Sequence, residues 1–259
     1  MGHPSREQAE AGAAVRIRVE RAFGDAAGLG GTYVLGHAGA DTVEQLLAPV
    51  AAEPGAVVES ARETLVRLPP DLPPAAAILV PVVAEALRAW DLTNPELGTT
   101  AIVTGASPWS ALMHTVAAWY GAWPALLGRS LDGEPRSTAD GGSLGALTRA
   151  LAEAPAVCAM ELTGRSDMVD LLLEAVPRYS SVLFAGPRAD RLTIDYYVNV
   201  HRKGLNLSST VLSPLRLFRS TTANDVLALR ACRFLMNPRY SSACAESLVP
   251  AIVSRPLES

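Results

Sequence analysis

Apolar and polar positions alternate along the first part of the chain. In residues 15–23, Val, Ile and Val alternate with Arg, Arg and Glu, a period of two that is typical of a half-buried strand. We expect a glycine-rich loop over residues 24–39, a short helix over residues 41–47 and two more strands within residues 55–70. Consecutive prolines in LVRLPPDLPP then break regular structure. The pattern therefore predicts a small β-rich region over residues 1–73.

A different pattern begins after the prolines. Apolar side chains recur at helical spacing over residues 74–90, and a buried strand follows over residues 100–104. That strand ends at Gly105, after which an apolar-rich helix over residues 109–120 leads to a short strand over residues 124–128. Strand, tight turn, helix and strand in this order predict the first βαβ unit of a doubly wound sheet.

Strands and helices continue to alternate further along. The sequence predicts a helix over residues 140–154, a buried strand within AVCAMELTG at residues 156–164, a helix over residues 167–175 and a strand within SSVLFAG at residues 180–186. Alternation of this kind indicates a parallel sheet with ligands at the carboxyl ends of its strands. We therefore expect an α/β protein whose residues 74–259 form a Rossmann-type doubly wound domain.

Composition and charge exclude several classes of protein. The chain has 259 residues, 49% of them hydrophobic and 19% charged, and its net charge of −4 offers no basic stripe for a nucleic acid. No run of eighteen uncharged apolar residues could span a membrane, and the polar N-terminus lacks the apolar core of a secretory signal. We expect a cytoplasmic protein with a small-molecule substrate. Cys158, Cys232 and Cys244 form no CxxC pair, so neither a disulfide framework nor a cysteine-rich zinc lobe is expected.

The turn after the first Rossmann strand is the candidate phosphate loop. A dinucleotide loop uses three glycines for the tight turn, for close approach to the pyrophosphate and for helix packing, but GASPWS keeps only Gly105 and has Ser107 and Ser110 at the other two positions. The Ser107 hydroxyl could donate to a phosphate beside the helix N-terminus, while Trp109 adds bulk nearby. The alternative is a strand-to-helix turn without a ligand.

Arg129 follows the next predicted strand. An acidic residue at this place suits the ribose hydroxyls of NAD, whereas an arginine suits the 2′-phosphate of NADP. The sequence Gly-Arg-Ser therefore favours NADP as cofactor, and the alternative is a solvated loop arginine.

Five segments in order and spacing resemble the medium-chain dehydrogenase/reductase superfamily. They match from about Gly55 to Leu212 and read LVRLPPDLPPAAAILVPVVAEALRAW, AIVTGASPWS, MELTG, SVLFAGP and LTIDYYVNVHRKGLNLSSTVL. The resemblance implies that the N-terminal region is a reduced GroES-like domain. It also implies that Thr163, Gly164 and Gly186 line the nicotinamide pocket.

The resemblance also shows where this chain departs from the family. Its zinc-dependent members hold a catalytic zinc with a cysteine, a Gly-His-Glu histidine and a third cysteine or glutamate. LGHAGADTV supplies His37 but has Ala38 in place of the glutamate, AFGDAAG has no cysteine, and the third position, near Val80, has no donor. We therefore expect no metal. The first domain is expected to be short, and the C-terminal segment that would complete it mostly absent.

Without zinc, carbonyl or enone reduction needs a donor to the developing oxyanion. Tyr33 and His37 are the candidates, and the alternative is that both simply pack or face solvent. The leading hypothesis is a zinc-independent NADP(H)-dependent oxidoreductase that acts on a small carbonyl or activated alkene. The other hypothesis is a non-redox member with a decayed dinucleotide site, either an isomerase or cyclase or a binding or assembly partner of another enzyme. By analogy with the family, LNLSSTVL is expected to be an edge strand through which a homodimer forms.

Overall fold

The chain divides into two compact units. The computed structural model describes residues 14–23, 32–39, 44–105, 107–129, 135–137, 157–186, 192–219 and 221–253. One unit comprises residues Met1–Glu85 together with Ser213–Ser259, and the other comprises Ala86–Leu212. The first unit thus extends to Glu85, beyond the expected boundary after residue 73, and it also includes the C-terminal residues from Ser213 onwards.

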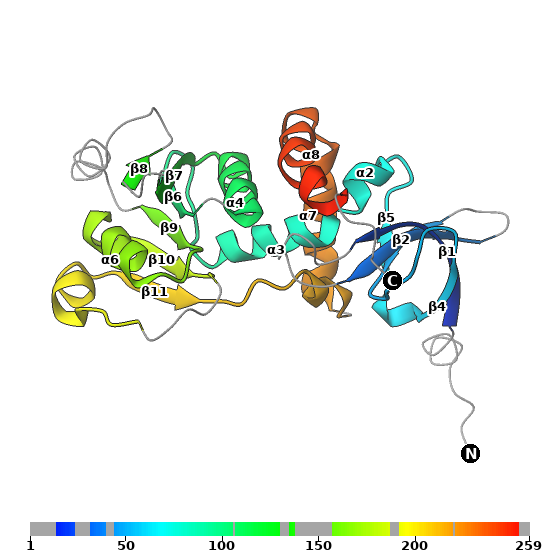
Figure 1. Ribbon diagram of the computed structural model, residues 1–259, viewed down its shortest axis with the longest axis horizontal. Coiled ribbons are helices and arrows are strands. Elements are labelled where there is room, and N and C mark those ends of the chain that lie inside the picture. The colour runs from blue at the N-terminus through cyan, green and yellow to red at the C-terminus, as the bar shows by residue number, and fades with distance from the viewer. Residues whose placement is uncertain are drawn as a thin grey trace, which may run out of the picture. The chain divides into compact units, whose positions relative to one another are not determined.

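The first unit contains an antiparallel sheet (Figure 1). Its described strands have the order β4-β1-β2-β3-β5. Their bounds are β1 (Ala14–Phe23), β2 (Tyr33–Ala38), β3 (Glu44–Ala48), β4 (Val57–Ala61) and β5 (Val66–Leu68), and the 3₁₀ turn η2 (Arg62–Thr64) joins the last two. The period-two pattern of residues 15–23 is confirmed because Ile17, Val19 and Phe23 are buried. The two strands expected within residues 55–70 are likewise present.

Two expectations for this sheet were wrong. The predicted glycine-rich loop contains β2, which pairs with both β1 and β3. A Cβ at Gly36 would lie 2.3 Å from the Arg18 carbonyl oxygen, so the glycine lets neighbouring strands approach closely. The helix predicted over residues 41–47 is replaced by β3, whose Leu46 and Leu47 are both buried. The apolar run within residues 41–47 is too short to show a clear helix or strand period, so its pairing with the neighbouring strands decides its conformation.

The C-terminal helices complete the first unit. They are the 3₁₀ helix η4 (Pro214–Phe218), α7 (Thr222–Met236) and α8 (Pro238–Val253), with α2 (Pro74–Ala77) packed against α7 and α8. A buried carboxylate anchors the returning chain, since Glu85 Oε1 accepts from the Ser213 N–H at 3.0 Å. The expectation that this returning segment is mostly absent was therefore wrong.

The second unit is the predicted Rossmann-type domain. The described strands form a sheet in the order β11-β10-β9-β6-β7-β8, in which the first five are parallel and β8 runs antiparallel to β7. They are β6 (Thr100–Thr104), β7 (Trp123–Arg129), β8 (Pro135–Ser137), β9 (Cys158–Glu161), β10 (Ser181–Phe184) and β11 (Asn206–Ser209). The α/β fold class is thereby confirmed, and β11 is an edge strand as expected.

Helices cover this parallel sheet. α4 (Pro108–Trp119) packs against β6 and β7, and α6 (Ser166–Ala175) packs against β9 (Figure 1). Ile102, Val182 and Leu172 from the strands and α6 share one buried cluster. The helix expected over residues 74–90 is divided into α2 and α3 (Val80–Asp91). The helix predicted over residues 140–154 lies outside the described residues.

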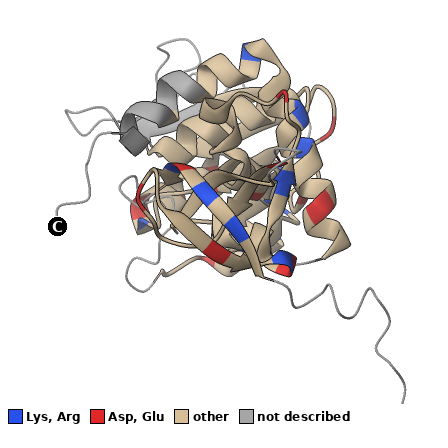
Figure 2. Cartoon of the chain, turned by 90° about the vertical axis from the view of Figure 1, so that its right-hand side faces the viewer, with Lys and Arg blue, Asp and Glu red and all other residues tan. Residues whose placement is uncertain are grey.

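Charges of both signs are mixed on the face shown in Figure 2. Exposed ion pairs join opposite charges in the first unit, for example Arg16 with Glu59 and Arg67 with Glu44. In the described part of the chain, none of the helices has the length and apolar character needed to cross a membrane.

Candidate functional site

The switch point of the Rossmann sheet lies between β6 and β9. These neighbouring parallel strands are joined to elements on opposite sides of the sheet, and ligands of such folds bind where the strands' carboxyl ends open a crevice. Here β6 leads into Gly105, and β9 leads into Thr163 and Gly164. The candidate site is built from these two turns.

Gly105 makes the first turn. Its φ is +93°, and a Cβ at this position would lie 3.0 Å from Ser110 Oγ and 3.2 Å from Thr163 Cγ2. Both the conformation and the space therefore require glycine. The same distances show that the Gly105 turn and the turn after β9 are in contact.

Ser107 and Ser110 form a capping box at the start of α4. The Ser110 N–H donates to Ser107 Oγ at 3.2 Å, the Ser107 N–H donates to Ser110 Oγ at 3.3 Å, and Ser110 Oγ–H donates to the Thr104 carbonyl at 3.0 Å. Pro108 contributes no N–H. Trp109 is only 7% exposed, so most of its side chain is buried.

The loop keeps enough of these features to fit a pyrophosphate. The tight turn at Gly105 is intact, and the start of α4 supplies the positive end of a twelve-residue helix. The available donors are the Trp109 N–H and the Ser107 hydroxyl. The Ser110 hydroxyl is buried and would have to release the Thr104 carbonyl to bind phosphate. Binding of a pyrophosphate here would therefore cost the free energy needed to break the hydrogen bonds of the capping box.

A buried carboxylate organises the second turn. Glu161 is 1% exposed and accepts from the Thr104 hydroxyl at 3.2 Å, the Thr163 N–H at 2.7 Å and the Gly164 N–H at 3.0 Å, and also from the Thr163 hydroxyl. A Cβ on Gly186 would lie 2.7 Å from the Gly164 nitrogen, so the turn after β10 packs directly on this one. Thr163, Gly164 and Gly186 are thus brought together.

Thr104 and Glu161 anchor this turn, a role that was not predicted from the sequence. The available signal was a pair of polar residues at the ends of two otherwise apolar strands. Buried polar groups in proteins are almost always paired with one another or with the backbone. The rule indicates that Thr104 and Glu161 each have a hydrogen-bond partner, but it does not identify that partner.

Arg129 is the last residue of β7, next to β6, where its predicted role requires it. Its backbone pairs with Pro135 of β8. Side chains in this strand segment lie outside the described residues, so a contact with a 2′-phosphate stays a prediction.

Tyr33 is a core residue of the first unit. Its side chain is 0% exposed, its hydroxyl donates to the Ile78 carbonyl at 2.8 Å, and its ring stacks on Phe23 and tilts against Phe218. Burial raises the pKa of this phenol well above its ordinary value. The interpretation of Tyr33 as an oxyanion donor is therefore corrected, because the hydroxyl is committed to the interior.

His37 lies on the same face of β2 as Tyr33, but near the end of the strand. Its Nε2 lies 2.7 Å from Glu20 Oε2, and both side chains are about one-third exposed. Its buried Nδ1 has no hydrogen-bond partner among the described residues. A histidine oriented by a carboxylate in this way can exchange a proton, so the predicted chemical role of His37 stays open.

The described residues do not fit a catalytic zinc. No three His, Cys, Asp or Glu side chains converge within the described ranges, and Nε2 of His37 is engaged by Glu20. Zinc in proteins takes three or more such ligands. We therefore derive no chemical step through a metal.

Comparison with known proteins shows the fold. No family model and no curated protein matches the sequence. Among solved structures, galactitol-1-phosphate dehydrogenase from Escherichia coli aligns with a TM-score of 0.65 at 14% identity, covering 94% of this chain and 90% of that one. The fold is that of the medium-chain dehydrogenases. An antiparallel GroES-like unit and a Rossmann unit are its two parts.

Two further structures with this fold contain a nicotinamide cofactor. A protein described as a zinc-binding dehydrogenase from Sinorhizobium meliloti was solved with NADP and has a TM-score of 0.59 at 17% identity, with 84% of this chain and 82% of that one covered. An alcohol dehydrogenase from Escherichia coli, solved with NADH, has a TM-score of 0.62 at 11% identity, with 93% and 84% covered.

Proposed function

We propose that this chain is a nicotinamide-dinucleotide-dependent oxidoreductase that reduces a small carbonyl or activated alkene without zinc. The observation that carries the proposal is the Gly105 turn between β6 and α4 at the switch point of the sheet. Proteins of the same fold have been solved with NADP and with NADH. Arg129 at the end of β7 favours NADP.

Each group of residues has a stated task in this proposal. A bound dinucleotide would supply the hydride. The start of α4 would hold the pyrophosphate through the Trp109 N–H and the hydroxyls of Ser107 and Ser110. Glu161 fixes the turn at Thr163 and Gly164, which would form a rigid wall beside the nicotinamide.

His37 is the proposed proton donor to the substrate oxygen. Because Nδ1 is buried, the donor would be Nε2, which would exchange its contact with Glu20 Oε2 at 2.7 Å for one with the substrate oxygen. Because no metal polarises the carbonyl in this proposal, a hydrogen bond from a side chain has to stabilise the developing oxyanion. Tyr33 has no part in this step.

Cofactor titration tests the proposal. The purified chain is titrated with NADPH and with NADH, and binding is followed by tryptophan fluorescence. We expect saturable binding of NADPH, and we expect Arg129→Ala to weaken NADPH much more than NADH, because only NADPH carries the 2′-phosphate. Absence of saturable binding at millimolar cofactor would refute the redox proposal, and equal losses for both cofactors would refute the role of Arg129.

Added zinc should leave the melting temperature unchanged, since specific binding to the native state would raise it.

One observation favours the second candidate, a non-redox protein with a decayed dinucleotide site. The capping box of Ser107 and Ser110 already satisfies backbone donors of α4, and Pro108 removes another. A protein of this kind would be an isomerase or cyclase, or a partner of another enzyme. The same titration separates the two candidates, because this one predicts no binding of either cofactor.

A further inference from the structure

A pocket lies at the amino ends of the strands of the Rossmann sheet, whereas the switch point lies at their carboxyl ends. It has a volume of about 470 Å³ and is lined by the end of α6 with the residues after it, and by the π-helix η3 (Tyr196–His201) with the residues after it. Both lining segments precede strands, β10 and β11 respectively, so the pocket is at the amino ends of these parallel strands. The phosphate loop lies at their carboxyl ends.

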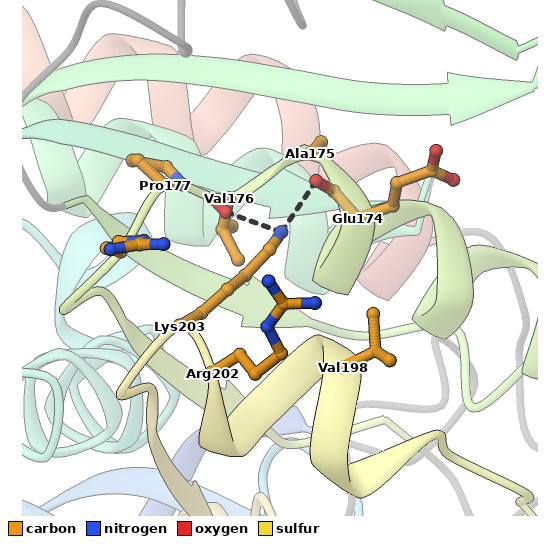
Figure 3. Close-up of a pocket in the computed structure, with 8 residues that line it drawn as sticks. Glu174, Ala175, Val176, Pro177, Val198, Arg202 and Lys203 are labelled. Carbon is orange, nitrogen blue, oxygen red and sulfur yellow. Dashed lines mark hydrogen bonds between the residues drawn. The ribbon is translucent and has the colours of Figure 1, made fainter.

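Three of the lining residues are cations and one is an anion. Arg178, Arg202 and Lys203 line the space together with Glu174, and Figure 3 shows Arg202 and Lys203 side by side. Within the described part of the chain, neither arginine side chain makes a hydrogen bond or an ion pair, and both residues are exposed. The pocket therefore holds two free guanidinium groups and an excess of positive charge.

Lys203 binds the end of α6 inside this pocket. Its ammonium donates to the carbonyls of Leu173 at 2.7 Å, Glu174 at 2.8 Å and Val176 at 3.0 Å. The last two of these hydrogen bonds are drawn in Figure 3. All three protons are thus used to cap the last turn of α6, which offsets the negative end of the helix. The lysine is thereby fixed in place, and the carbonyls that would repel an anion are covered.

The two lining segments are joined into a rigid wall. The Tyr179 N–H donates to the Lys203 carbonyl at 2.9 Å, and the Asn206 N–H donates to the Ser180 carbonyl at 3.0 Å. Tyr179 has φ +64°, an unusual conformation for a bulky residue, and its ring lies so close to Gly204 that a Cβ there would be 3.2 Å away. Strained backbone of this kind persists where the surroundings enforce it and is concentrated at functional sites.

We propose that this pocket binds a small phosphorylated molecule. Guanidinium groups pair with phosphate oxygens in a bidentate geometry, and a phosphate monoester carries close to two negative charges at neutral pH. Three cations against one carboxylate leave an excess that matches such a dianion. Val198 and Pro177 supply apolar surface for the organic part, and Glu174 can accept from its hydroxyl groups. The proposal does not depend on redox activity.

Binding of inorganic phosphate to the purified full chain tests this site. Titration calorimetry is performed at constant ionic strength set with chloride, so that general screening is held fixed. We expect saturable binding that falls about tenfold or more in the double variant Arg178→Ala/Arg202→Ala, because each guanidinium contributes charge-assisted hydrogen bonds. Lys203 is left unchanged because it holds α6.

Arg16→Ala is the matched control. Arg16 is an exposed arginine on β1 that pairs with Glu59, outside the pocket, and its removal should leave phosphate binding unchanged. Phosphate should also protect Arg178 and Arg202, but not Arg16, from phenylglyoxal, as read by peptide mass mapping. No saturable binding, or equal binding in the double variant and the wild type, would overturn the site. The double variant should still bind NADPH as the wild type does, so failure here is distinguishable from failure of the cofactor proposal.

Discussion

At the scale of single residues, the Tyr33 hydroxyl donates to the Ile78 carbonyl inside the first unit. Tyr33→Phe removes this hydrogen bond and leaves a buried carbonyl without its partner, so we expect a loss of about 1 kcal/mol in the free energy of unfolding. Urea denaturation measures the loss, and the exposed Tyr197 gives the control variant Tyr197→Phe, whose effect should be within about 0.5 kcal/mol. Loss of turnover with unchanged stability would instead restore a catalytic role to Tyr33.

The three cysteines are also residues whose environment determines their chemistry. All are free and buried, and desolvation raises the pKa of the Cys158 thiol, that of Cys232 to about 11 and that of Cys244 to about 12. We expect the native protein to resist thiol reagents at pH 8, and all three thiols to react once it is unfolded. A fast-reacting thiol in the native protein would contradict this burial.

The raised thiol pKa values also predict a loss of stability at alkaline pH. In the unfolded chain these groups titrate near 9.0, the ordinary thiol value, while in the native state they stay protonated to higher pH. The contribution of these thiols to the free energy of unfolding is therefore complete below pH 9, and it is lost as the pH rises from 9 towards 12. Urea denaturation at pH 7 and pH 10 should show the fall, and Cys244→Ala should make it smaller.

At the scale of elements, the start of α4 shows competition between a cap and a ligand. Ser107→Gly should reduce stability by only a few tenths of a kcal/mol, roughly the difference between serine and glycine as caps. It also removes a hydroxyl that is proposed to donate to the pyrophosphate, so binding of NADPH should become weaker by up to about fivefold. Thr221→Gly, which removes the equivalent cap of α7 in the first unit, is the control and should not change binding. Tighter binding in Ser107→Gly would instead show that the serine acts only as a cap, which competes with the phosphate for the Ser110 N–H.

At the scale of the whole molecule, we propose a homodimer formed through the edge strand β11. The N–H groups of Asn206 and Thr210 point towards β10, so by alternation those of Leu207 and Ser209 point outwards. Sedimentation should give roughly twice the chain mass of 27.2 kDa. Ser209→Pro removes an outward N–H without touching the β10 ladder and should produce monomers with little loss of stability. A monomeric wild type would rule out the dimer.

The sequence by itself determined the elements that depend on neighbouring residues. The strand over residues 100–104, the turn at Gly105 and the helix after it follow from hydrophobic period, glycine and proline, and they occur where predicted. The alternation of strands and helices likewise indicated the parallel sheet, because buried parallel strands need helices on their faces.

Only the tertiary structure decided the features that join distant parts of the chain. Thr104 and Glu161 are 57 positions apart, and Tyr33 and Ile78 are 45 apart. The strand β3, the return of the C-terminal helices to the first unit and the pocket around Lys203 depend in the same way on pairing and packing. A local pattern records which side chains prefer burial, but only the folded chain determines which group becomes the partner of a buried polar atom.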